Sequence, residues 1–179
     1  AVRTPTPTPV LEHEAPALAR LEVAPRSDGL PVRAVALHFP AEDGDSVLSI
    51  AAELPGGAPR LRPVEGSPDL AQDFTVLALV RDASGRVVHK ASRRYALTWP
   101  KSKAAELAAS RVLFEREAVL PPGRYVVDVV AYDAQADLAG VARASLLVPT
   151  AGPAPRLSSL VVVGHTERRA LACVQPGRP

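Results

Sequence analysis

Two acidic turns are the segments whose residue types best suit a bound metal ion. Asp43 and Asp45 lie in the turn at residues 41–45, and Asp133 and Asp137 lie in a later loop. Calcium is held by several carboxylate and carbonyl oxygens, which such turns supply. Neither turn has the twelve-residue spacing of an EF-hand loop, and aspartates are common between strands because they hydrogen-bond the local backbone. We therefore predict solvated turns and no metal site, with these four aspartates as the calcium candidates.

The local motifs of the common enzyme classes do not occur in the sequence, although paired acids for glycoside hydrolysis can come from residues far apart in the chain. The four histidines are scattered without the close spacing of zinc ligands, and Cys173 is the only cysteine. A catalytic thiol needs a positioned histidine, and nothing marks one here. No nucleophile elbow, Walker loop or dinucleotide-binding fingerprint is present. We predict that the protein is not an enzyme and has no catalytic residue and no cofactor, while the role of Cys173 stays open.

A basic stretch follows an acidic half of the chain. Residues 1–80 carry six Arg against eleven acidic residues, whereas residues 81–116 carry nine Lys or Arg against three acidic residues. These basic residues alternate with apolar ones and have few aromatic neighbours, which is typical of a solvated strand face and not of a nucleic-acid surface. We expect no nucleic-acid partner; the stretch is either solvated or docks onto the acidic half of a neighbouring copy or domain. The interaction candidates are Arg86, Lys90, Arg93, Arg94 and Trp99.

Short apolar strands, separated by turn signals at intervals of about ten residues, must position these side chains. In residues 30–40 the larger apolar side chains, Val35, Leu37 and Phe39, share one face, and we place Phe39 in the core. A short helix is expected at residues 101–111, with Ser102 as its N-cap. The pattern predicts an all-β, antiparallel immunoglobulin- or fibronectin-III-like sandwich of about seven to eight strands with one short helix. The strands are expected at 30–40, 46–54, 73–81, 86–97, 112–120, 124–132 and 141–148.

Two turns carry the residues with structural roles. Gly85 ends the turn at residues 82–85, where a positive φ suits a hairpin. Gly123 ends a Pro-Pro-Gly turn that leads into Tyr125. We expect the Tyr125 ring to be buried at the start of its strand and its hydroxyl to reach the loop backbone, as in the tyrosine corner of sandwich folds.

Proline and glycine content divides the chain into three parts. Residues 1–29 begin with Thr-Pro repeats, which favour an extended chain, and are predicted to form a Pro-rich tether. Residues 30–149 form the sandwich domain. Residues 150–179 form a linker with an extra strand at 156–163 and a tail.

The sequence resembles the C-terminal region of bacterial VWFA-related proteins, in which a von Willebrand A-type domain precedes a sandwich-like region. The resemblance covers roughly residues 30–163, and its motifs are Asp-Ala-Ser-Gly at 82–85, Leu-Pro-Pro-Gly-Arg-Tyr at 120–125, Leu-Leu-Val-Pro at 146–149 and Leu-Ser-Ser-Leu-Val at 157–161. It implies an exported, multidomain context. The Asp-x-Ser-x-Ser adhesion motif of the von Willebrand A domain is absent, so no adhesion function follows from the resemblance.

The function that these features favour is that of a noncatalytic structural or protein-interaction module in an extracytoplasmic multidomain protein, periplasmic or secreted, from a high-GC bacterium. Two alternatives stay open: a carbohydrate- or polymer-binding sandwich, and a subunit of a larger assembly with threading Pro-rich tails. Sugar binding requires two or three exposed aromatic side chains on one face. No apolar stretch approaches the roughly 20 residues of a membrane-spanning helix. The sequence does not identify the partner or the oligomeric state.

Overall fold

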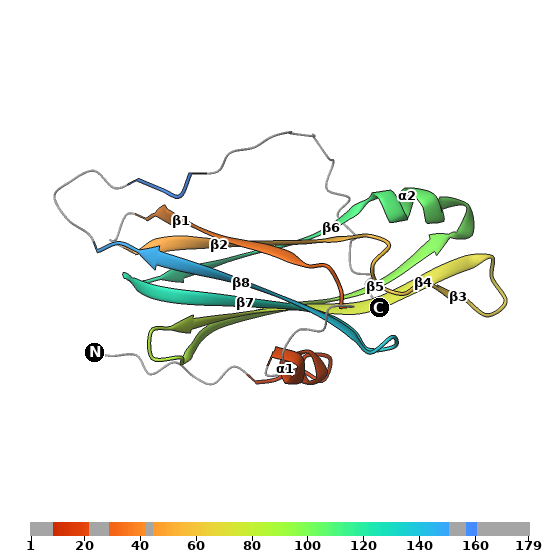
Figure 1. The fold of residues 1–179 in the computed structure, drawn as a ribbon, viewed down its shortest axis with the longest axis horizontal. Helices are drawn as coiled ribbons and strands as arrows, with labels where there is room; N and C mark the ends of the chain where they lie inside the picture. Colours follow the sequence, from red (N-terminus) through yellow and green to blue (C-terminus); the bar gives the residue numbers. More distant parts are fainter. Residues whose placement is uncertain (1–8, 22–28, 42–44, 151–156, 161–179) are drawn as a thin grey trace, which may run out of the picture.

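Two antiparallel β-sheets lie face to face in this computed structural model, which describes residues 9–21, 29–41, 45–150 and 157–160. The predicted all-β antiparallel sandwich is confirmed (Figure 1). The three-stranded sheet has the order β1-β2-β6 and consists of β1 (Arg33–Pro40), β2 (Ser46–Pro55) and β6 (Arg111–Leu120). The five-stranded sheet consists of β3 (Arg62–Pro63), β4 (Asp69–Asp82), β5 (Val87–Pro100), β7 (Gly123–Asp133) and β8 (Leu138–Val148). In this sheet β4 pairs with β3, β5 and β7, and β8 pairs with β7.

The core lies between the two sheets and is filled by every second residue of their strands. Leu48, Ile50 and Leu54 of β2 are fully buried, because their positions alternate with those that face solvent. The Phe74 ring of β4 stacks on the Tyr95 ring of β5, with the ring centroids 4.9 Å apart. The inward positions of the central strands are thus apolar and interdigitated, and this packing holds both sheets together.

The prediction that Phe39 lies in the core is wrong, because its side chain is 41% exposed. Side chains of directly opposite residues in an antiparallel pair lie on the same face. Ala36 pairs with Ile50, which is buried, whereas Leu37 pairs with Ser49 on the other face. The two alanines of β1, Ala34 and Ala36, therefore face the core, and the larger apolar side chains of β1 face outward.

The two predicted turns form as expected. Tyr125 is buried, and its hydroxyl donates a hydrogen bond to the carbonyl oxygen of Pro121 over 2.8 Å. A Cβ at Gly123 would lie 3.3 Å from the Tyr125 hydroxyl oxygen, so this glycine leaves room for the ring. Gly85 has a φ of 82° and donates its N–H to the Asp82 carbonyl oxygen over 2.9 Å.

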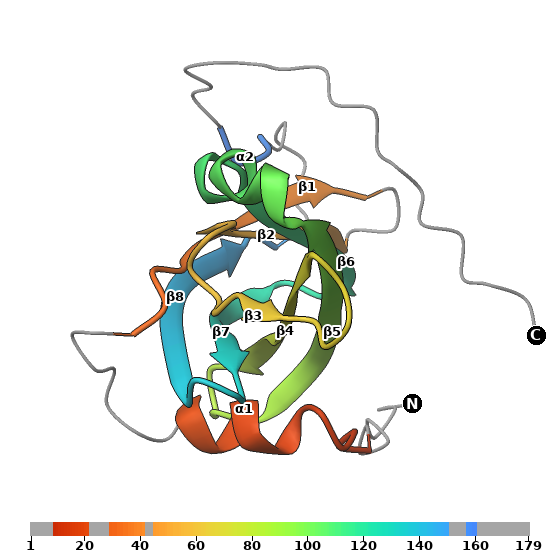
Figure 2. The same ribbon diagram turned by 90° about the vertical axis from the view of Figure 1, so that its right-hand side faces the viewer.

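The predicted helix is present, and a second helix that we did not predict precedes the sandwich. The helix α2 (Ala104–Ala109) follows a 3-10 turn, η1 (Lys101–Lys103). Ser102 does not cap it, because the N-cap positions fall on Pro100 and Lys103 and neither makes a side-chain cap. The other helix, α1 (Ala15–Leu21), lies on the outer side of the five-stranded sheet (Figures 1 and 2). None of the described helices is long and apolar enough to cross a membrane.

Candidate functional site

The outer face of the five-stranded sheet is covered by residues 9–21, the N-terminal segment. Ala17 of α1 is fully buried against Leu77, Leu79 and Val130 of the sheet, and Leu18 and Leu21 pack against the same cluster. We placed these residues in a tether, but the structure packs them against the sandwich. A seven-residue helix is too short to be stable alone in water, so this apolar contact must stabilise it.

Glu14 anchors the N-terminal segment to β5 through a buried ion pair. Its carboxylate is paired with the Lys90 ammonium and accepts hydrogen bonds from the Ser92 hydroxyl over 2.5 Å and the Leu11 N–H over 2.8 Å. Lys90 also donates to the Pro9 carbonyl oxygen over 2.7 Å. Burial raises the pKa of the Glu14 carboxyl, but the hydrogen bonds from Lys90 and Ser92 outweigh it and lower the pKa below its ordinary value. Lys90, an interaction candidate, therefore has its acidic partner within the same chain.

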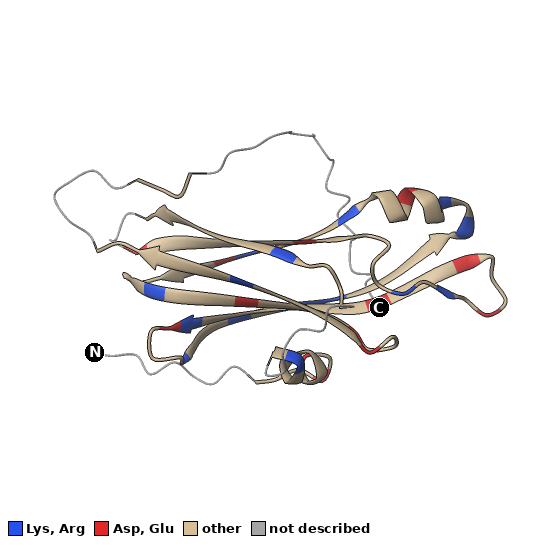
Figure 3. Ribbon diagram, viewed as in Figure 1, with Lys and Arg blue, Asp and Glu red and all other residues tan. Residues whose placement is uncertain are grey.

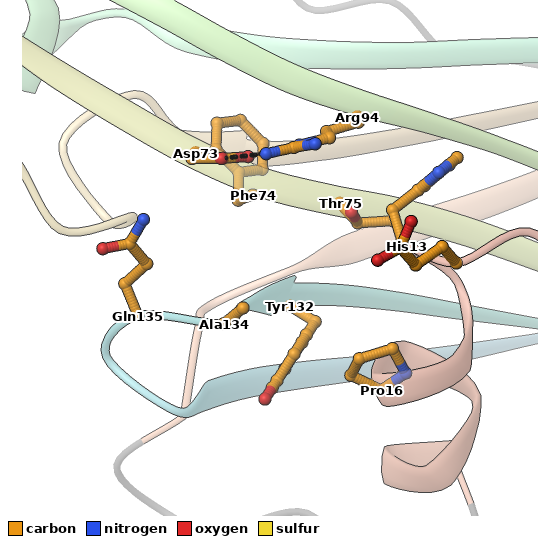
Figure 4. Close-up of a pocket in the computed structure, with 10 residues that line it drawn as sticks. His13, Pro16, Asp73, Phe74, Thr75, Arg94, Tyr132, Ala134 and Gln135 are labelled. Carbon is orange, nitrogen blue, oxygen red and sulfur yellow. Dashed lines mark hydrogen bonds and ion pairs between the residues drawn. The ribbon is translucent and has the colours of Figure 1, made fainter.

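A polar hollow of about 350 Å³ lies between the N-terminal segment and the β7–β8 turn (Figure 4). Asp73 and Arg94 form a bidentate ion pair at its rim, with distances of 2.8 Å and 2.5 Å. This pair lowers the pKa of Asp73 and leaves neither group free as an acid or base. The hydroxyl of Thr75 and the side chain of Gln135 also border the hollow. The side chains of Glu12 and His13 also line the hollow, so its polar groups extend beyond the neutralised pair.

Two other interaction candidates, Arg86 and Arg93, also have partners within the described chain. Arg86 pairs with Asp82 inside the β4–β5 hairpin, and the Arg93 guanidinium lies 5.0 Å from the centroid of the Tyr95 ring. Trp99 is half-buried. Figure 3 shows acidic and basic positions interspersed along the strands. The excess positive charge of residues 81–116 is therefore partly compensated by carboxylates of this chain, at Arg86, Lys90 and Arg94.

The described calcium candidates, Asp45, Asp133 and Asp137, form no metal-binding cluster. Both carboxylate oxygens of Asp133 accept backbone N–H groups, that of Arg60 over 2.7 Å and that of Gln135 over 2.9 Å. Asp137 instead pairs with Arg20 and accepts from the Tyr132 hydroxyl. Asp45 lies in a separate loop, whereas Asp43 falls outside the described residues. Within the described ranges, no three His, Cys, Asp or Glu side chains could hold one metal ion. Cys173 also lies outside these ranges.

The outer face of the three-stranded sheet carries the apolar residues 35, 37 and 39 of β1 and the acidic residues 115 and 117 of β6, with Arg33 and Arg111 at one end. Val35, Phe39, Leu113 and Val119 on this face are between 41% and 64% exposed. Val35 and Glu115 pair with the same residue of β2, Ala51, and therefore lie in one row across the sheet. Leu37 and Glu117 share a row in the same way, and Leu113 and Val119 lie near the two ends of β6. A shallow hollow of about 290 Å³ opens at one end, between Val35 and Leu113. Sequence reasoning missed this face, although the signal was present: β1 has apolar residues at both odd and even positions.

Comparison with known proteins yields only distant structural similarity. No protein-family model matches the chain, and no curated protein sequence matches it significantly. A Bacteroides uniformis beta-glucuronidase is 13% identical over 66% of this chain and 12% of its own, with a TM-score of 0.40. A calcium binding mutant of Bacteroides uniformis beta-glucuronidase 2 is 15% identical over 69% of this chain and 13% of its own, with a TM-score of 0.42. A Northeast Structural Genomics Consortium target is 13% identical over 79% of this chain and 97% of its own, at a TM-score of 0.37. The chain thus spans about an eighth of the length of these glucuronidases, and we base no functional inference on similarity at this level.

Proposed function

We propose that this chain is a noncatalytic interaction module that binds a neighbouring domain of the same extracytoplasmic, multidomain protein through the outer face of β1, β2 and β6. The observation that carries the proposal is the set of large apolar side chains exposed on that face, Val35 and Phe39 of β1 and Leu113 and Val119 of β6, beside acidic ones. Contiguous apolar surface on a soluble domain marks contact sites. The partner surface that fits has an apolar centre and basic side chains opposite Glu115 and Glu117.

Two further features support this context. The pairing of strands into β1-β2-β6 and β5-β4-β7-β8, together with the Tyr125 corner, agrees with an immunoglobulin-like module, a fold common in multidomain proteins. The resemblance to the region that follows the von Willebrand A-type domain of bacterial VWFA-related proteins supports an exported, multidomain setting.

The carbohydrate-binding alternative is less well supported by the geometry. Stacking on sugars needs exposed aromatic rings, but Tyr95, Tyr132 and Phe114 are buried. Phe39 and Trp99 remain, and they belong to different sheets. The assembly alternative, with threading tails, would require the N-terminal segment to bind another subunit, whereas here it packs on its own sheet.

Hydroxyl-radical footprinting of the isolated chain and of the whole gene product tests the proposal. In the whole product we expect the labelling of Val35, Phe39, Leu113 and Val119 to fall several-fold, because a neighbouring domain shields them. Leu147 of β8 is 57% exposed and should be labelled equally in both, which makes it the control. Equal labelling at all five positions would overturn the proposal, as would a gene product with no further domain. Shielding that appears only as the isolated chain self-associates in sedimentation would assign the face to a second copy instead.

A matched pair of variants separates this face from general surface effects. Leu113→Glu should restore the labelling of Val35 in the whole gene product, because it places a carboxylate in the contact. Leu147→Glu, at a similarly exposed position of the other sheet, should leave that labelling low. Cell fractionation of the source organism tests the extracytoplasmic location separately.

A further inference from the structure

The N-terminal segment covers part of the outer face of the five-stranded sheet and leaves one end of it open. It packs on Leu79, Val130 and Val141, which fixes the outward-facing positions of β4, β7 and β8. Figure 1 shows α1 away from the end of the sheet where β7 begins and β8 ends. Toward that end the outward-facing side chains are arginines beside apolar and hydroxyl-bearing ones, and we call this set the basic end. It consists of Arg81 of β4, Arg124 and Val126 of β7, and Arg143, Ser145 and Leu147 of β8.

The basic end is accessible in the part of the chain that the structure describes. The Arg143 side chain is 67% exposed and Leu147 is 57% exposed, and Arg124 and Ser145 are also exposed. A hollow of about 480 Å³ opens here, with Arg124, Ser145 and Leu147 in its lining. A ligand can therefore reach charged, hydroxyl and apolar groups at one place.

Asp128 holds two of the three arginines in fixed positions. Its side chain is only 4% exposed. One of its carboxylate oxygens accepts from Arg81 Nε over 3.3 Å, and the other accepts from Arg143 Nε over 2.6 Å. Because hydrogen bonds of this charge-assisted kind add geometric specificity, the two guanidinium groups are oriented before any ligand binds.

The basic end has a net positive charge and, within the described residues, unpaired hydrogen-bond donors. Its three arginines share the single carboxylate of Asp128, and Asp82, which also borders the hollow, is paired with Arg86. Arg143 contacts Asp128 through Nε, and no hydrogen bond from its Nη groups or from the Arg124 guanidinium to a described residue is found. The planar fork of a guanidinium matches a carboxylate bidentately. A ligand that carries carboxylates therefore fits this end of the sheet.

The covered part of the same face indicates a peptide as the ligand. There an acidic and partly apolar stretch of this chain lies on the sheet, with Glu14 paired to Lys90 and Ala17 packed on Leu77. The basic end offers the same two kinds of contact, arginines for carboxylates and Leu147 for an apolar side chain. A sulfated sugar would use the charges and leave Leu147 without a contact.

We propose that the basic end binds an acidic peptide segment of another protein. Carboxylates of the segment lie on Arg124 and Arg143, and an apolar side chain of the segment lies on Leu147. This site is separate from the outer face of β1, β2 and β6, which fits a partner with basic side chains, so either proposal can fail without the other.

Fluorescence anisotropy with a labelled peptide tests the site on the full chain. The probe is a fluorescein-labelled peptide of alternating Leu and Glu, and the control peptide has Gln in place of each Glu. We expect saturable binding of the probe that weakens as the salt concentration rises, because exposed charges are screened, and no saturable binding of the control peptide. Absence of saturable probe binding, or equal binding of both peptides, would overturn the proposal. Tighter binding of sucrose octasulfate than of the probe would assign the basic end to sulfated sugars instead.

Matched arginine variants locate the contact. Arg124→Gln with Arg143→Gln should weaken probe binding about tenfold or more, because two charge pairs with the peptide are lost. Arg33→Gln with Arg111→Gln removes the same charge from exposed positions of the other sheet and should change the affinity less than about threefold. Leu147→Ser should weaken probe binding several-fold while all three variants keep the thermal unfolding transition of the native chain. Equal loss of binding in the two arginine pairs, or unchanged binding in Leu147→Ser, would overturn the proposal.

Discussion

The two outer faces of the sandwich are both partly apolar, but within the described residues only one of them is covered by another segment of the chain. On the five-stranded sheet the N-terminal segment covers Leu77 and Val130 completely, and the buried pair of Glu14 and Lys90 fixes its position. On the three-stranded sheet, Leu113 is 53% exposed, and acidic side chains lie beside it. The first face has a partner within the described chain, and the second has none there. An apolar outer face of this sandwich therefore indicates an external contact site only where no segment of the same chain covers it.

The largest effect should come from matched leucine truncations on the two faces. We expect Leu77→Ala to lower the free energy of unfolding by about 3 kcal/mol, because it opens a cavity under α1, whereas Leu113→Ala should cost less than about 1 kcal/mol. Urea denaturation measures both. Equal costs would mean that the N-terminal segment does not cover its face in solution, and the contrast between the faces would disappear.

Removing the ammonium at position 90 should release the N-terminal segment. Lys90→Ala leaves Glu14 buried without its counter-charge, a loss of about 3 kcal/mol if the segment stayed in place. The segment can instead detach, so we expect limited proteolysis to cut within residues 9–21 while the sandwich stays folded. Arg94→Ala, which removes an exposed ion pair, is the control and should cost no more than about 1 kcal/mol. Continued protection of the segment in Lys90→Ala would show that its apolar contacts suffice.

Acid should weaken the docking of the N-terminal segment through Glu14. The pKa of Glu14 is lower in the folded chain than its ordinary value, so its contribution to docking is complete above about pH 4.3 and is lost as the pH falls through the folded pKa. Amide exchange of Leu18, whose N–H donates to the Glu14 carbonyl oxygen over 2.8 Å, should show loss of protection between pH 6 and pH 3 after correction for intrinsic rates. Asp73 and Asp82 also have lowered pKa values, so Glu14→Gln is the control that removes this titration alone. An unchanged pH profile in Glu14→Gln would assign the effect to those aspartates.

The smallest effect on stability is expected at the exposed end of β6. Val119 is 64% exposed, so Val119→Thr should change the free energy of unfolding by less than about 0.5 kcal/mol. The substitution keeps the β-branched shape and adds a hydroxyl. A cost well above 1 kcal/mol in urea denaturation would show that something covers this residue in the isolated chain.

Alternation in the sequence identified the central strands well, since Leu48 and Ile50 face the core and their neighbours do not. The Pro-Pro-Gly turn before Tyr125 predicted the tyrosine corner equally well, because the hydrogen bond from the Tyr125 hydroxyl joins residues only four positions apart. β1 was misjudged because it is apolar at both odd and even positions, and which set faces inward depends on its pairing with β2.

The covering of the five-stranded sheet was not predictable from local pattern. A seven-residue helix has little signal of its own, and its stability comes from contact with residues 60 to 115 positions later in the chain. The partners of the basic stretch were missed for the same reason. Lys90 lies beside β4 by strand pairing, but its carboxylate partner, Glu14, reaches it only through the fold.

The Glu14 anchor also has a mechanical consequence. Tension applied from the N-terminal side of the chain would reach the Glu14 anchor on β5 and the contacts of α1 with β4, β7 and β8 before it reached β1. Detaching residues 9–21 would release 13 residues, roughly 45 Å of extended chain, at the expense of the contacts on the outer face. The core between the sheets would still be intact at that extension, since none of its buried residues belongs to the detached segment. In a chain that joins domains, the N-terminal segment would thus act as a reserve of length that yields before the fold does.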